Sequence, residues 1–146
     1  MSASIERNKE LGRRFTEVLN NRQWDLLDEL VAPDFQRHCQ ATPGVVVKSL
    51  EEFKAFLRAD AASFPDSVQT PRLIVAEDDM IAVWAAYEGT QLGQMGPFPP
   101  SGKRMSIDFS AMIRVEAGKI AELWVVWDNV AALTQLGHLP APGKIG

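Results

Sequence analysis

The feature that most constrains the fold is a change of hydrophobic period near the middle of the chain. In the first half, apolar residues recur at helical spacing in three segments. The first predicted helix is capped by Ser4 and ends near Asn20. The second runs from Trp24 to Val31, because Pro33 disfavours its continuation. The pattern therefore predicts two amphipathic helices before residue 33.

The third predicted helix has the clearest boundaries. Ser49 and Glu52 form the sequence of a capping box, in which each side chain satisfies a free backbone N–H at the start of a helix. Pro65 marks the end of the segment. One stripe of this helix is apolar and carries Phe53, Phe56, Leu57 and Phe64.

From residue 71 onward the period changes to the alternation that is typical of strands. The predicted strands are Pro71–Glu77, Ile81–Thr90, Arg104–Val115 and Ile120–Asp128, joined in pairs by tight turns. Helices grouped before antiparallel strands indicate an α+β fold, with three N-terminal helices packed on a mostly antiparallel sheet. Because long strands twist, we expect a strongly curved sheet that forms a cone with an internal pocket.

Composition and charge exclude several classes of partner. The chain has 146 residues and a net charge of −4, and its basic residues are scattered, so we expect no nucleic-acid partner. The apolar runs are far shorter than the roughly 20 residues that span a bilayer. The N-terminus has no apolar signal core, so we predict a cytoplasmic protein without a membrane partner. A single domain over residues 1–146, with an irregular tail at 139–146, fits this length.

Four segments carry a resemblance to a known family. They are NKELGRRFTEVLNNRQWDLLDELVAPDFQRH, FKAFLRADAASFPD, GTQLGQMGPFPPSGKRM and IRVEAGKIAELWVVWDNVAALTQLG, which together cover most of the chain. In order and spacing they resemble the SnoaL-like polyketide cyclases, which belong to the cone-shaped superfamily of nuclear transport factor 2 and ketosteroid isomerase. The resemblance implies a deep apolar pocket for a small hydrophobic molecule, no cofactor or metal, and a homodimer formed through the outer sheet face.

The same resemblance also implies where catalytic residues should lie. In such cyclases, a carboxylate and a polar partner on the last two long strands promote an intramolecular aldol closure. Aligned on the turn at Gly118, the two positions fall on Ala111 and Val125, which cannot transfer a proton. Three functions remain open. The first is cofactor-free proton transfer in aldol cyclisation, isomerisation or dehydration, and the second is non-catalytic binding of a small ligand in a pocket that has lost its acid/base pair. The third is a dimerisation module whose pocket is filled by its own aromatic side chains.

The segment ELWVVWDN offers one remaining carboxylate, Asp128. Strand alternation places Leu123, Val125 and Trp127 on one face, which we predict lines the pocket, and Asp128 on the other. A bulge at the strand end could turn Asp128 inward as a catalytic acid. The alternative is that Asp128 caps the end of the strand or forms a turn.

Other polar side chains could also face the pocket. His38 follows Phe35 at a position where the family often has histidine, and it could act as a base or only tie a loop in place. Tyr87 and Gln91 could bind a carbonyl or hydroxyl, although a buried tyrosine often satisfies its hydroxyl structurally. The full set of predicted site residues is His38 and Asp128 as catalytic groups, with Phe35, Tyr87, Gln91, Met95, Phe98, Ala111, Leu123, Val125 and Trp127 as ligand contacts.

A loop and the outer face of the sheet offer further candidate contacts. Met95 and Phe98 lie in a Gly/Pro-rich loop that could close over the pocket. On the outer sheet face, Trp84, Trp124 and Val126 would form the apolar surface of a dimer.

Overall fold

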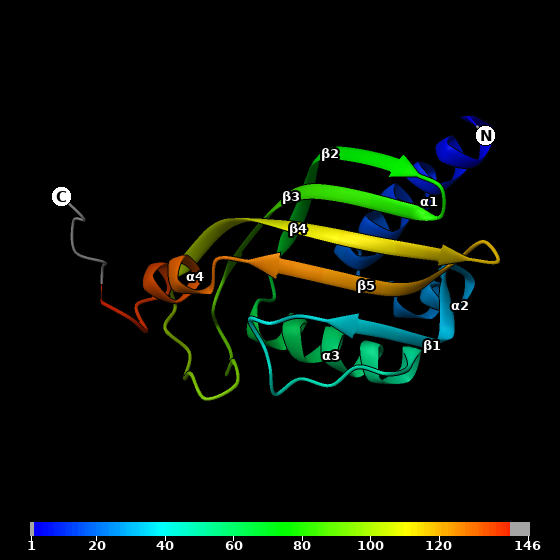
Figure 1. Cartoon of the computed structure of the whole chain (residues 1–146). Coiled ribbons are helices and arrows are strands. Elements are labelled where there is room, and N and C mark those ends of the chain that lie inside the picture. Colours follow the sequence, from blue (N-terminus) through cyan, green and yellow to red (C-terminus); the bar gives the residue numbers. More distant parts are fainter. Residues whose placement is uncertain (1, 141–146) are drawn as a thin grey trace.

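The structure is a computed structural model and describes residues 2–140 (Figure 1). Four α-helices and five strands follow one another in these residues, and a short 3-10 helix precedes the second α-helix. In chain order they are α1 (Ser2–Asn20), η1 (Trp24–Leu26), α2 (Leu27–Leu30), β1 (Val31–His38), α3 (Leu50–Ser63), β2 (Val68–Glu77), β3 (Met80–Thr90), β4 (Arg104–Glu116), β5 (Lys119–Trp127) and α4 (Asn129–Gln135).

The strands form one curved sheet in the order β1-β5-β4-β3-β2. Three neighbouring pairs are antiparallel, and the pair of β1 with β5 is parallel. Tight turns close both long hairpins, with Asp78 and the Ala117-Gly118 pair in the left-handed backbone region that such turns require. The predicted α+β fold with a mostly antiparallel sheet is thereby confirmed.

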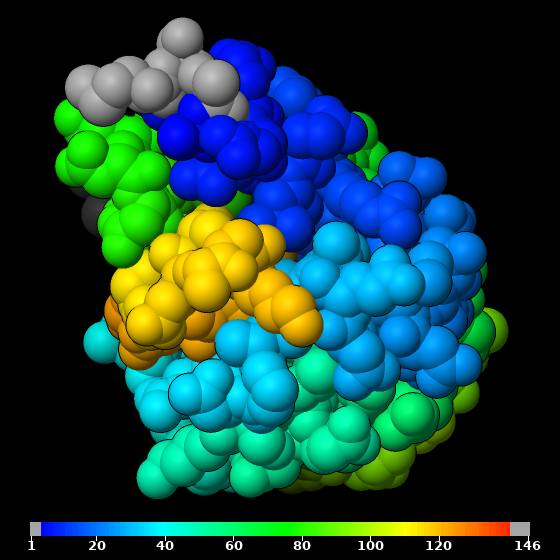
Figure 2. All heavy atoms as spheres, turned by 90° about the vertical axis from the view of Figure 1, so that its right-hand side faces the viewer, coloured from blue at the N-terminus to red at the C-terminus, as the bar shows by residue number. Residues whose placement is uncertain are grey.

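The helices cover one face of this sheet. In Figure 1, α1 crosses behind β2 and β3, while α3 lies beside β1. The core between these layers is rich in phenylalanine: Phe53 of α3 lies 4.6 Å from Phe35 of β1 and 6.1 Å from Phe15 of α1, between ring centroids. Seen from the end that carries the β4–β5 turn, α1, α2 and this turn form a continuous surface (Figure 2).

The boundaries of α3 agree with the sequence prediction. Ser49 is its N-cap, and the Ser49 hydroxyl accepts a hydrogen bond from the backbone N–H of Glu52 at 3.1 Å. The helix ends at Ser63, just before Phe64 and Pro65. The capping box and the proline therefore locate this helix to within one or two residues.

Two elements were not predicted, and two predicted helix boundaries are wrong. Residues from Val31 onward form strand β1 and do not extend the second helix. Pro33 is tolerated there because β1 is an edge strand and its pairing with β5 is interrupted between Val31 and Gln36. The N–H group that proline lacks is therefore not needed for a hydrogen bond between the strands. The first helix begins at Ser2, so Ser4 lies inside it and is not its cap. The short helix α4 was not predicted either.

The alternation predicted for the last strand is confirmed. On β5, Leu123 and Val125 are buried against the helices, whereas Trp124 and Val126 are exposed on the outer face. None of the described helices is long and apolar enough to cross a membrane. Of the predicted irregular tail, residues 141–146 lie outside the described part of the chain.

Candidate functional site

The polar groups that the fold brings together on the inner side of the sheet come from α3 and β3. Asp60 lies on α3, three residues before its end, and Tyr87 lies on β3. The Tyr87 hydroxyl donates a hydrogen bond to Asp60 Oδ2 at 3.0 Å. Both side chains are only partly accessible to solvent. The inner face therefore holds a carboxyl group at hydrogen-bond distance from a phenol.

Burial changes the acid/base properties of this pair. Desolvation raises the pKa of the Asp60 carboxyl above its usual range, and the Tyr87 hydrogen bond, Arg37 and Arg22 only partly offset the effect. Burial also raises the pKa of Tyr87, so its hydroxyl stays protonated and remains a donor. A carboxyl group with a raised pKa is a stronger base than an ordinary aspartate and is suited to accept and return a proton.

A guanidinium group lies in the same interior. Arg37 follows Phe35 by two residues on β1 and faces inward, and it is only 9% exposed. Its Cζ atom lies 4.2 Å above the ring of Phe56 and 6.0 Å from the ring of Trp127. Desolvation lowers the pKa of Arg37, and the neighbouring Cys39 and Asp60 partly offset this. Sequence reasoning missed both Arg37 and Asp60.

A small cavity of about 20 Å³ reaches Asp60 and Tyr87 from the side where α1 ends. It lies between the end of α1, helix α3 and the start of the β2–β3 hairpin, and its lining includes Arg22, Trp24, Leu57 and Ser67. This volume is close to the space that one water molecule needs. The candidate site therefore opens next to the connection between α3 and β2.

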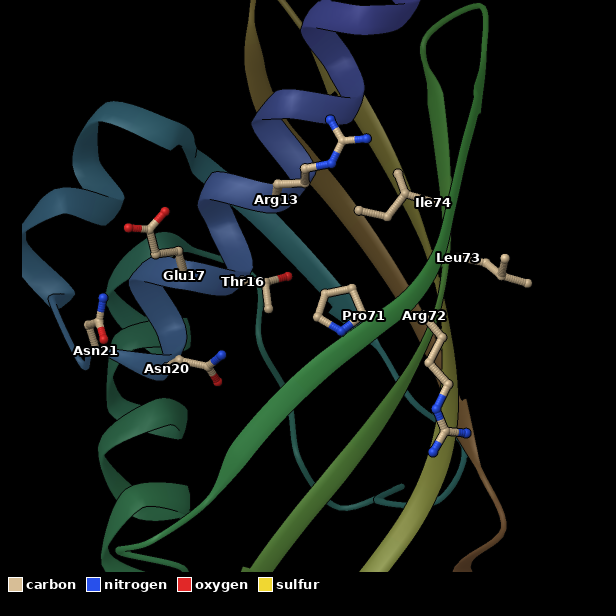
Figure 3. A pocket seen from close by; sticks show the side chains of 9 residues that line it. All are labelled: Arg13, Thr16, Glu17, Asn20, Asn21, Pro71, Arg72, Leu73 and Ile74. Atoms are coloured by element: carbon tan, nitrogen blue, oxygen red, sulfur yellow. The ribbon is translucent and has the colours of Figure 1, made fainter.

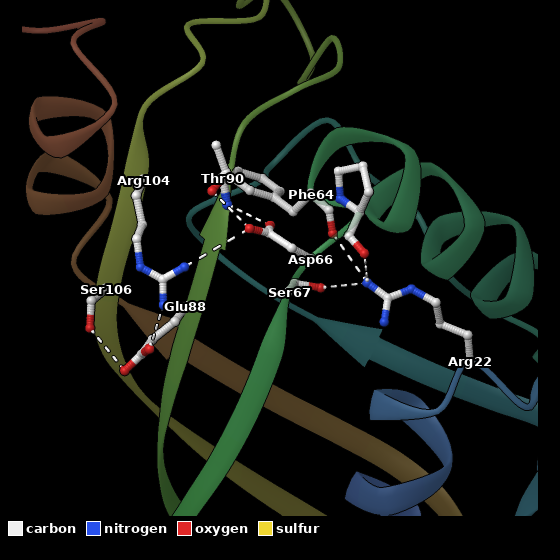
Figure 4. A network of polar contacts seen from close by, with 9 residues as sticks. Arg22, Phe64, Asp66, Ser67, Glu88, Thr90, Arg104 and Ser106 are labelled. Carbon is white, nitrogen blue, oxygen red and sulfur yellow. Dashed lines mark hydrogen bonds and ion pairs between the residues drawn. The ribbon is translucent and has the colours of Figure 1, made fainter.

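That connection is held by a polar network (Figure 4). Arg22, in a left-handed backbone conformation, donates to the carbonyl oxygens of Phe64 and Pro65 and to the Ser67 hydroxyl, at 2.9 to 3.2 Å. Asp66 accepts hydrogen bonds from the backbone N–H and the hydroxyl of Thr90, which lower its pKa. Asp66 thus shapes the turn into the sheet.

Asp128 lies outside this interior. Its side chain is exposed and caps α4 by accepting a hydrogen bond from the backbone N–H of Ala131 at 3.0 Å. The strand alternation that points Trp127 inward points Asp128 outward, and no bulge of β5 reverses it. Of the two roles predicted for Asp128, an inward-facing catalytic acid or a cap, the structure shows the cap.

His38 also faces away from the interior. It is exposed at the end of β1, its ring stacks on Trp124, and its Nε2 atom lies 2.6 Å from Glu122 Oε2. Glu122 also accepts a hydrogen bond from Arg114 at 3.2 Å, and these contacts lower the pKa of Glu122. Because alternation places Arg37 inside, its neighbour His38 must lie outside. The predicted placement of His38 in the pocket is therefore wrong.

Gln91 is completely buried but has no free polar atom for a ligand. Its Nε2 atom donates to the carbonyl oxygens of Gly93, Phe98 and Pro99, and its Oε1 atom lies 2.6 Å from His138 Nε2. The His138 ring in turn packs on Phe98 at 4.8 Å. Gln91 thus fastens the loop after β3 to the segment after α4.

The remaining predicted contacts divide between two apolar clusters. Phe35, Ala111 and Leu123 are buried in the main core, and Ala111 pairs with the equally buried Val125 across β4 and β5. Met95 and Trp127 are partly buried in a second cluster around Phe64, Met105, Ala132 and Leu136, which also includes Tyr87. Ala111 and Val125, the positions to which the resemblance assigns the acid/base pair, are therefore adjacent, inward-facing and apolar.

A larger groove, of about 530 Å³, lies elsewhere between α1 and β2 (Figure 3). Its two arginines already have partners, since Arg13 pairs with Glu10 and Arg72 with Asp108. Figure 3 shows these arginines on opposite sides of the groove rather than pointing at one place. It lacks the convergent polar groups of a catalytic site.

Residues 2–140 contain no cluster of three or more His, Cys, Asp or Glu side chains that could hold a metal ion. Within this described part, the interior brings the Asp60 carboxyl group, the Tyr87 phenol and the Arg37 guanidinium together among aromatic side chains. Such a set can move a proton and bind an oxygen atom.

The fold and this interior define an α+β protein of the cone-shaped class. The sequence profile of the SnoaL-like polyketide cyclases matches residues 9–136, and the chain belongs to that family. No curated protein matches the chain significantly.

Solved structures agree with this assignment. TsrD from Streptomyces laurentii is 25% identical, with a TM-score of 0.82, over 92% of this chain and 97% of its own. IdmH from Streptomyces antibioticus, described as a candidate polyketide cyclase, is 29% identical, with a TM-score of 0.78, over 89% of this chain and 98% of its own. A SnoaL-like protein from Jannaschia sp. CCS1 is 22% identical, with a TM-score of 0.83, over 93% of this chain and 95% of its own. At this identity the likeness shows the shared fold alone.

Proposed function

We propose that this protein catalyses a cofactor-free proton transfer on a small, hydrophobic, oxygenated molecule, with Asp60 as the acid/base group. The supporting observation is the carboxyl group of Asp60, whose pKa burial raises and whose Oδ2 atom accepts a hydrogen bond from Tyr87. It replaces the carboxylate that the family has at the position of Val125, and it comes from a helix instead of a strand.

The proposed chemical step needs only this chain. The Asp60 carboxylate removes a proton from a carbon next to a carbonyl group, and the C–H electron pair becomes the C=C bond of an enolate whose charge rests on oxygen. The protonated Asp60 then returns the proton, either to carbon or to the oxygen formed when the enolate attacks a second carbonyl. Tyr87 positions Asp60 and, through its hydrogen bond, favours the ionised form.

Uptake of such a molecule requires the interior to open, because the cavity beside Asp60 holds about one water molecule. The opening proposed here separates α3 from the end of α1, where Arg22 is the polar link to the turn after α3. The apolar side chains around the site would then contact the body of the ligand.

The test is deuterium exchange at the carbon next to the carbonyl of 2-tetralone, a bicyclic ketone, followed by proton NMR in heavy water. The protein should accelerate exchange above the buffer rate, and Asp60→Asn should remove the acceleration. Asp128→Asn is the matched comparison, since asparagine also caps helices. Loss of exchange in the Asp128 variant with full exchange in the Asp60 variant would contradict the proposal.

A second candidate function is non-catalytic binding of the same kind of ligand. The observation in its favour is the buried Ala111–Val125 pair at the two family positions for proton transfer. Saturable binding of 2-tetralone without any accelerated exchange in the wild-type protein would support this function and exclude the catalytic one.

We also propose that two copies associate through the outer sheet face. This face exposes neighbouring apolar side chains on four strands, including Leu73, Trp84, Met112 and Val126. Sedimentation should show a dimer for the wild-type chain and a monomer for Val126→Asp. A wild-type monomer at high concentration would remove this proposal.

A further inference from the structure

The Arg37 guanidinium is a buried cation without a carboxylate at ion-pair distance in the described residues. It has five N–H donors, and its side-chain partners are the Thr42 hydroxyl, in a long contact of 3.5 Å, and the side chain of Cys39. No carboxylate of the described residues lies within 4.0 Å of it, although eleven such ion pairs occur elsewhere in these residues. Burying an unpaired charge is costly, so a residue in this state indicates a missing anion.

Aromatic side chains flank the guanidinium in the interior. One face of the guanidinium is covered by Phe56 at 4.2 Å, so its free N–H groups point along its own plane.

This environment defines the chemistry of a ligand. A planar guanidinium binds two oxygen atoms that share one negative charge, as in a carboxylate or the enolate of a 1,3-dicarbonyl compound. The rings of Phe56 and Trp127, beside the guanidinium, suit a flat apolar body attached to that group.

We propose that Arg37 is the anion-binding residue of the interior and that the ligand is a flat, apolar molecule with a delocalised oxyanion. The proposal rests on the proposed function in one respect: Arg37 would hold the oxygen on which charge develops when Asp60 removes the proton. Arg37 and Asp60 act on each other electrostatically, each shifting the pKa of the other toward its charged form. Binding of a stable anion does not itself need Asp60.

The test compares benzoate with benzamide, which has the same shape but no charge, by isothermal titration calorimetry. Wild-type protein should bind benzoate at least about tenfold more tightly, the effect of one charge-assisted contact worth about 1.4 kcal/mol. Arg37→Gln should remove this preference, and Arg37→Lys should restore part of it. Arg72→Gln, which removes an exposed arginine paired with Asp108, is the matched control and should keep it.

A second probe addresses the enolate. Benzoylacetone should bind more tightly as pH rises through its own ionisation, and this rise should be absent in Arg37→Gln. Equal affinity for benzoate and benzamide in the wild-type protein would overturn the proposal, as would an absence of benzoate binding up to its solubility. A folded Arg37→Gln variant that still prefers benzoate, with folding checked by circular dichroism, would also overturn it.

The two proposals fail in different ways. Asp60→Asn should bind benzoate at least as tightly as the wild-type protein, because it removes a nearby negative charge, while it loses proton exchange on 2-tetralone. Benzoate preference without any exchange in the wild-type protein would reject Asp60 as the catalytic group and leave the assignment of Arg37 standing.

Discussion

Replacing Tyr87 by phenylalanine tests the energetic link between the phenol and the buried carboxyl group. The substitution removes the 3.0 Å hydrogen bond to Asp60 and keeps the aromatic ring, which packs edge-on against Phe64 at 5.8 Å. A hydrogen bond to an ionised group contributes about 1.5–3 kcal/mol and one between neutral groups about 0.5–1.5 kcal/mol. The loss of stability should therefore be about 2 kcal/mol when Asp60 is ionised and about 1 kcal/mol when it is protonated.

The sign of the pH dependence follows from the direction of the pKa shift. Because the pKa of Asp60 is raised in the folded state, the wild-type protein binds more protons than the unfolded chain between the unfolded and folded pKa values. The contribution of Asp60 to stability is thus fully present below the unfolded pKa and is lost as pH rises through the folded pKa. Without the Tyr87 hydrogen bond, which lowers this pKa, the loss becomes larger.

The assay is urea denaturation of wild-type and Tyr87→Phe proteins from about pH 3 to about pH 8, across the usual and raised range of an aspartate. The difference in the free energy of unfolding should grow by about 1 kcal/mol with rising pH. In an Asp60→Asn background the same substitution should give a constant difference. A difference that stays constant or shrinks with pH in the wild-type background would refute the reasoning.

Three further predictions concern stability. Phe53→Ala, at the centre of the phenylalanine core and 1% exposed, should lower the free energy of unfolding by about 3–5 kcal/mol in urea denaturation, and a loss below about 1 kcal/mol would mean that the core is packed differently. Asp128→Ala should cost about 1 kcal/mol by removing the cap of α4, while Asp128→Asn should be nearly neutral in thermal denaturation; equal losses would argue against the cap. Gln91→Leu should cost about 1–3 kcal/mol, because three carbonyl groups lose their shared donor, and should increase hydrogen exchange in the loop at 92–103. Unchanged exchange there would contradict the fastening role of Gln91.

The sequence predicted the elements whose signals are local. Helix α3 has its capping box at Ser49, and the hairpin strands have clear alternation that also gave the correct facing of Leu123 and Val125. Strand β1 could not be predicted in the same way, because Pro33 and an irregular burial pattern obscure it and its partner β5 lies more than eighty residues away. The sequence offered no period long enough to predict α4, which has seven residues.

The site residues were harder to predict because their environment is built from distant segments. Asp60 is a charged residue on a helix, and its burial results from contact with Tyr87, which comes from β3. One local signal does exist: Asp60 lies seven residues after Phe53 and four before Phe64, within the apolar stripe of the helix. Arg37 has a similar signal, since it shares strand parity with the buried Phe35.

The central claim is that Asp60 is a buried acid/base group, and the most direct measurement is a pH titration of its side-chain carboxyl carbon by NMR in the wild-type protein. The account predicts a midpoint above the ordinary aspartate value of about 3.9, because burial raises the pKa of Asp60. The Tyr87 hydrogen bond and Arg37 offset part of this rise, so the midpoint should lie still higher in Tyr87→Phe. A midpoint at or below the ordinary value would contradict the account, because the carboxyl group would then be solvated or firmly ion-paired.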